Sequence, residues 1–131
     1  MKVFETLIVS ERQYELKLAM GDMVKLEAKL GCDIMTGMLK ITSVTTLAEF
    51  YFAALRPWND SIKDIEDVYS LFDEYIIQGG TYEELQQKIL DVLVLSGIMS
   101  QKQCEFFKKA AEKQKATLEK LLTETGDTLS V

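Results

Sequence analysis

The sequence predicts a mainly α protein, a compact bundle of about five helices that includes a long C-terminal helix and is compatible with a short N-terminal β-hairpin. Apolar residues recur at i, i+3, i+4 and i+7 spacing in several separate segments, the pattern of helices that bury one face. Capping residues and glycines stand between these segments, and the chain has a single proline. With 131 residues, 47% of them hydrophobic, the chain can bury a core without a disulfide or a metal.

Residues 3–18 have the alternation of a β-hairpin. Tyr14, Leu16 and Leu18 would share one face of a strand, and the stretch from Phe4 to Val9 can supply its partner. A hairpin of two strands needs helices behind it for stability. We therefore expect one helical domain over residues 1–131, with the hairpin in 1–18, a helical body in 20–98 and the C-terminal helix in 100–124.

Two helices are predicted in the first half of the body. The first spans residues 20–30, buries Met23, Leu26 and Leu30, and ends at Gly31 as a left-handed cap. Residues 33–39 add one more helical turn. The second begins after Thr42 or Ser43 and runs through residue 55, because Pro57 forces a stop.

Three later helices are predicted from capping boxes, in which two side chains three residues apart satisfy each other's backbone N–H groups. The third helix is expected to bury Ile76 in its apolar stripe and to end at Gly79. The fourth has a wider stripe and is expected to be buried on two sides. The three predicted boxes are Ser61 with Asp64, Thr81 with Glu84, and Ser100 with Gln103.

The charge distribution argues against nucleic-acid binding. The net charge is −6: residues 1–100 hold 9 basic and 16 acidic side chains, and residues 101–131 hold 6 basic and 5 acidic ones. An acidic body repels a phosphate backbone. The asymmetry is explained either by solvation of the helix faces or by pairing of the tail of one subunit with the body of another.

No apolar run approaches the roughly 20 residues that a membrane-spanning helix needs. The short apolar stretch at residues 7–9 is also too short for a signal-peptide core. We therefore expect no membrane insertion and a cytoplasmic protein. Cys32 and Cys104 lie in apolar patterns without CxxC spacing, so they are expected to be reduced core thiols.

No set of residues for catalysis is present. The chain has no histidine, which removes the commonest general base and zinc ligand. The phosphate-binding and nucleophile motifs GxxxxGK[ST], GxGxxG and GxSxG are absent. The acidic cluster Asp60, Asp64, Glu66 and Asp67 lacks the order of an EF-hand loop and is expected to be a solvated helix face. We predict no catalytic, cofactor-binding or metal-binding residue, and no cofactor.

Candidate partner-binding residues are large apolar side chains that the core of a compact body need not bury. Trp58 follows Pro57 and can either anchor a partner or pack over the turn between two helices. The last helix alternates between apolar and polar stretches, and its far leucines can be buried only against something outside a compact body. The candidates are Trp58, Phe106, Phe107, Leu118, Leu121 and Leu122.

Residues 14–99 resemble the tail assembly chaperones of long-tailed phages and of prophages in Gram-positive bacteria. The resemblance is carried by two runs, Leu26-Glu27-x-x-Leu30-Gly31 and Asp67-x-Tyr69-x-x-x-Asp73-Glu74-Tyr75-x-x-x-Gly79-Gly80. It implies a non-enzymatic chaperone that self-associates and binds the apolar helices of the tape measure protein, keeping them soluble before the tail tube polymerises. The tail tube protein is a further candidate partner. The alternative is a structural phage component, such as a head-tail connector or tail-terminator subunit, that stays in the virion.

Overall fold

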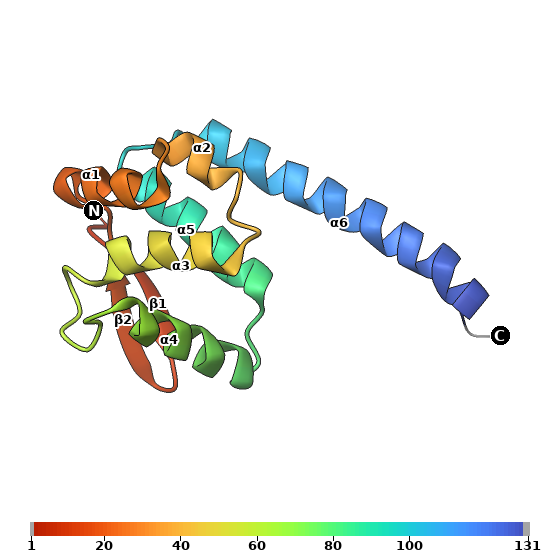
Figure 1. Ribbon diagram of the computed structural model, residues 1–131, viewed down its shortest axis with the longest axis horizontal. Helices are drawn as coiled ribbons and strands as arrows, with labels where there is room; N and C mark the ends of the chain where they lie inside the picture. The colour runs from red at the N-terminus through yellow and green to blue at the C-terminus, as the bar shows by residue number, and fades with distance from the viewer. Residues whose placement is uncertain (1, 130–131) are drawn as a thin grey trace. The chain divides into compact units, whose positions relative to one another are not determined.

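The computed structural model describes residues 2–129, and it describes their side chains except at 115 and 124–129. The structure is 64% helical and has a two-stranded antiparallel hairpin at its N-terminal end, so the predicted mainly α class is confirmed (Figure 1). The chain divides into two compact units, Met1–Met99, here called the body, and Ser100–Val131. The elements in order are β1 (Glu5–Val9), β2 (Arg12–Leu16), α1 (Met20–Leu30), α2 (Ile34–Met38), α3 (Val44–Leu55), α4 (Ile65–Ile77), α5 (Tyr82–Leu95) and α6 (Gln101–Leu129).

The predicted hairpin is present and joins the core through one face. Strands β1 and β2 pair in antiparallel register, with Leu7 opposite Tyr14, and both side chains are buried. The turn residues Ser10 and Glu11 have φ of 47° and 68°, the left-handed values that a tight two-residue turn requires. The side chain of Gln78 accepts from the Ser10 N–H at 2.7 Å and donates to the Ile8 carbonyl at 3.0 Å, which ties the turn to the end of α4.

Helix α3 forms the centre of the body. It packs against α1, α4, α5 and β2, and Figure 1 shows it between α1 and α4. Neighbours on several sides require an apolar surface wider than one stripe, and α3 has such a surface. Six of its side chains are fully buried, Leu47, Ala48, Phe50, Tyr51, Ala54 and Leu55.

Several helix boundaries follow from local signals, as predicted. Helix α1 spans Met20–Leu30, and Gly31 ends it with φ of 72°. Helix α5 begins with the predicted capping box of Thr81 and Glu84. It is buried on two sides, because it packs against both α3 and β1 and also buries Leu90.

Three predictions about the body are wrong in detail. Helix α4 begins three residues later than expected, because Asp64 is the N-cap and pairs with Asp67, while Ile62 just before it is buried in a turn. Ile76 is 46% exposed in the last turn of α4, where the neighbouring Ile77 is 83% exposed. Leu30 is half-buried rather than buried, because it lies in the last turn of α1.

The C-terminal unit consists of one helix. The predicted box is present: Gln103 N–H donates to Ser100 Oγ at 3.1 Å, and Ser100 N–H donates to Gln103 Oε1 at 2.9 Å. Helix α6 runs to Leu129 and not to residue 124. Gly126 costs a helix about 1 kcal/mol and does not by itself end it, because it retains its backbone donor and acceptor.

Candidate functional site

Three leucines in the second half of α6 form an apolar surface. Leu118, Leu121 and Leu122 are 57%, 54% and 61% exposed. Their i, i+3, i+4 spacing places them on one face of the helix. More than half of each leucine side chain is therefore accessible to solvent.

The two adjacent phenylalanines of α6 point to different sides of the helix. Phe107 is half-buried and lies eleven residues before Leu118, close to three full turns, so it shares the face of the leucines. Ala111, which is exposed, lies between them at seven residues from Leu118. Phe106 is 69% exposed on a neighbouring side, with its ring centroid 6.0 Å from that of Phe107. We call Phe107, Ala111, Leu118, Leu121 and Leu122 the α6 stripe.

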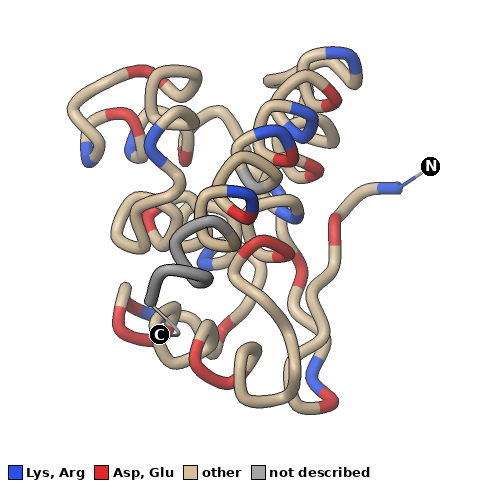
Figure 2. Tube along the Cα trace, turned by 90° about the vertical axis from the view of Figure 1, so that its right-hand side faces the viewer, with Lys and Arg blue, Asp and Glu red and all other residues tan. Residues whose placement is uncertain are grey.

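Charged residues flank the α6 stripe without segregating by sign. Lysines and glutamates are interspersed along the helix, as the alternating colours in Figure 2 show. This arrangement keeps an amphipathic helix hydrated on one side while its other side stays apolar. An amphipathic helix of this kind can bind an apolar surface.

Trp58 belongs to the body and is held by internal contacts. Its Nε1 donates to the Lys17 carbonyl at 2.9 Å, and its ring packs edge-on against Phe4, with the centroids 5.1 Å apart. It keeps 37% exposure. Both contacts are with the N-terminal segment, since Phe4 precedes β1 and Lys17 follows β2, so Trp58 links the turn after α3 to the hairpin.

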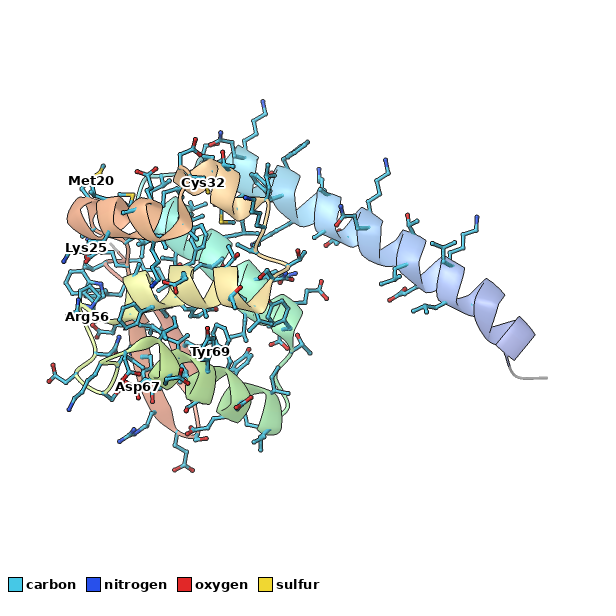
Figure 3. The ribbon with its side chains drawn as sticks, viewed as in Figure 1. Met20, Lys25, Cys32, Arg56, Asp67 and Tyr69 are labelled. Atoms are coloured by element: carbon cyan, nitrogen blue, oxygen red, sulfur yellow. The ribbon has the colours of Figure 1, made fainter. Side chains whose placement is uncertain are left out.

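Sequence reasoning missed a groove of about 430 Å³ between α1, α3 and the start of α4. Its residues come from three separate segments, so no local pattern indicated it. Figure 3 labels two of them, Lys25 on α1 and Arg56 just after α3, at the same end of the body. We call it the α1–α3 groove; it is lined by Asp22, Lys25, Leu26, Lys29, Glu49, Phe52, Ala53, Arg56, Pro57, Lys63, Asp64 and Ile65.

The acidic cluster at the start of α4 has a structural role. Asp67 accepts from the N–H groups of Lys63 and Asp64 at 2.8 and 3.1 Å, and these two hydrogen bonds lower its pKa. Asp64 in turn accepts from the Asp67 N–H. Among the side chains that the structure describes, no group of acidic, cysteine and histidine residues could hold a metal ion.

The other shifted carboxyl groups are also helix caps. Hydrogen bonds from the Tyr75 hydroxyl and from Thr81 lower the pKa of Glu84, and the Thr36 N–H lowers that of Asp33.

The cysteines Cys32 and Cys104 form no disulfide. Cys104 is buried as expected, whereas Cys32 is half-buried beside the exposed C-cap of α1 and is not a core thiol.

Comparisons of the chain with protein-family models, with curated proteins and with solved structures found no match. Within residues 2–129, no helix has both the length and the apolar character needed to cross a bilayer.

Proposed function

We propose that this protein is a phage tail assembly chaperone. In this proposal it acts in the host cytoplasm, self-associates, and covers apolar helices of the tape measure protein until the tail tube polymerises around them. The proposal starts from the resemblance of residues 14–99 to that family. The observation that carries it is the exposure of Leu118, Leu121 and Leu122 on one face of α6.

The physical argument is that such an assembly factor must bind reversibly. An exposed row of leucines costs free energy in water, roughly 25 cal/mol for each Å² of apolar surface, and this cost is recovered when another apolar helix covers the row. The charged flanks keep the free protein dissolved. An amphipathic helix laid against another apolar surface is a common mode of recognition and requires no bond-making residue.

The test measures whether this protein keeps a client soluble. An apolar helical segment of the tape measure protein is mixed with increasing amounts of the chaperone, and the sedimentable fraction is measured. We expect sedimentation to fall as the chaperone approaches and then exceeds an equimolar amount. Unchanged sedimentation at excess chaperone contradicts the proposal.

A matched pair of variants separates the α6 stripe from a general charge effect. Leu118→Asp with Leu122→Asp places two charges on the stripe, and we expect it to abolish protection of the client. Ala116→Asp with Thr123→Asp adds the same two charges on the opposite side of α6, where both residues are exposed. Equal loss of protection in both variants would show that the stripe is not the binding surface.

A further inference from the structure

The α1–α3 groove concentrates positive charge in an acidic chain. Four of the nine basic residues among residues 1–100 line it, against three of the sixteen acidic ones. The rest of the body is therefore much more acidic than the groove. At physiological salt, charges more than about 8 Å apart are largely screened, so a ligand in the groove responds to these residues rather than to the net charge.

The four cations of the groove have no close ionic partner among the residues that the structure describes. Lys25 and Lys29 lie one turn apart on α1, and Arg56 and Lys63 flank the loop between α3 and α4. None of the four forms an ion pair within the described part of the chain. The carboxylate of Asp64, one of the three acids of the groove, is already engaged with the backbone of Asp67.

The lining between the charged groups is apolar. Leu26 is buried, while Phe52, Ala53 and Ile65 are half-buried and keep part of their surface accessible. The guanidinium of Arg56 lies 5.9 Å from the centroid of the Phe52 ring, which is within cation–π distance. The apolar lining and the charged rim therefore meet at these two residues. The ligand that fits must therefore present apolar and anionic groups together.

The volume limits the size of what enters. About 430 Å³ is near the lower end for small-ligand pockets and accommodates one or two side chains rather than a whole helix. A helix lying across the groove can insert one apolar side chain and place carboxylates one turn away on either side.

We propose that the α1–α3 groove docks an acidic amphipathic helix of a partner protein, which inserts an apolar side chain between Lys25 and Arg56 and pairs its flanking carboxylates with the cations of the rim. This site shares no residue with the α6 stripe and does not depend on the proposed chaperone function. A nucleic-acid backbone fits the groove less well, because Asp22 and Glu49 also line it and its floor is apolar.

The test uses the whole protein and a synthetic helical peptide. A fluorescein-labelled, alanine-rich helix carries one leucine with glutamates four residues before and after it, and a matched peptide carries lysines in place of the glutamates. Binding is followed by fluorescence anisotropy. We expect the glutamate peptide to bind at least about tenfold more tightly than the lysine peptide and to weaken as salt is raised.

Two variants of equal charge locate the binding. Lys25→Glu with Arg56→Glu reverses two groove cations, and we expect it to raise the Kd of the glutamate peptide at least about tenfold. Arg12→Glu with Lys40→Glu makes the same change of net charge at exposed positions outside the groove, and we expect a Kd within about twofold of the unchanged protein. Circular dichroism checks that both variants keep their helices.

A third variant tests occupancy of the groove without changing its charge. Ala53→Met fills the floor from α3, a position where methionine is a good helix former, and we expect it to weaken the glutamate peptide severalfold. The proposal is overturned by equal binding of both peptides, by equal loss in the two charge variants, or by undiminished binding to Ala53→Met. It is also overturned if labelled duplex DNA binds more tightly than the peptide, or if sedimentation shows that the groove variant has lost contact with a second copy of this chain.

Discussion

Tyr51 joins three elements of the body through one side chain. It is fully buried on α3, its hydroxyl donates to the Leu85 carbonyl of α5 at 2.7 Å, and its ring stands edge-on to Phe72 of α4 with the centroids 4.9 Å apart. Burial raises the pKa of this hydroxyl well above its ordinary value of 10. The hydroxyl therefore stays protonated and remains a donor throughout the neutral range.

Removing only the hydroxyl of Tyr51 tests the value of this hydrogen bond. Tyr51→Phe keeps the ring contact and loses one buried hydrogen bond, so we expect the free energy of unfolding to fall by about 1 kcal/mol. Urea denaturation at neutral pH measures it. Tyr82→Phe is the control, because the Tyr82 hydroxyl donates at 3.0 Å to Ile41 from a half-buried site and its loss should cost less. An unchanged urea midpoint in Tyr51→Phe contradicts the expectation.

Asp67 predicts a pH dependence of stability. Its pKa is lowered from 3.8 by the N–H groups of Lys63 and Asp64, so the folded state holds its proton less tightly than the unfolded state does. The stabilisation is therefore present above the ordinary pKa and is lost as the pH falls through the folded value. Asp67→Asn should lower the denaturant midpoint near neutral pH.

The same variant should lose its effect in acid. Below the folded pKa the wild-type carboxyl is protonated and no longer accepts as an anion, so it resembles the amide of Asp67→Asn. We expect the two denaturant midpoints to converge as the pH falls below the ordinary pKa of 3.8 and through the lower pKa of the folded state. A gap that stays constant down to pH 2 would mean that the charge of Asp67 does not stabilise α4.

At the scale of elements, the C-terminal helix makes the clearest prediction. Leu118 and Leu122 lie one turn apart on the exposed face of α6, so replacing both by aspartate removes an apolar surface without opening the core of the body. We expect the double variant to associate more weakly with itself by analytical ultracentrifugation. Its helical circular dichroism should stay within the small change that two surface substitutions cause. Loss of most helical signal at room temperature would make these leucines part of an internal core.

The capping boxes show why element starts were only partly predictable. Thr81 with Glu84 has no competing box within one turn, and α5 begins there. Before α4, Ser61 with Asp64 and Asp64 with Asp67 both have the required spacing, and local chemistry does not choose between them. Burial of Ile62 at 5% exposure selects the second, because it holds the residues before Asp64 in a turn.

At the scale of the whole molecule, the two candidate surfaces differ in physical character. The α6 stripe is apolar, whereas the α1–α3 groove has a charged rim. Apolar contacts persist or strengthen in salt, while contacts between exposed charges weaken. Salt dependence can therefore separate the two modes of binding in one protein.

We expect protection of an apolar client to persist in about 1 M sodium chloride, where the Debye length is near 3 Å. Client sedimentation is measured at low and high salt with the same chaperone ratio, and the client alone is the control for salting-out. Protection that disappears at high salt would mean that charge, and not the leucines of the α6 stripe, carries client binding.

By itself the sequence determined the helical class, the hairpin, and the ends of α1 and α5. These depend on neighbouring residues: Gly31 tolerates a left-handed φ, and Glu84 reaches the backbone of Thr81. The sequence also indicated the exposed leucines of α6, because apolar residues spaced three and four apart lie on one side of a long helix. Only the tertiary structure decided that Ile76 is exposed, that Trp58 is held by Phe4 and Lys17, and that Lys25, Arg56 and Lys63 line one groove. Those facts depend on residues far apart in the chain, and packing, not local propensity, brings such residues together.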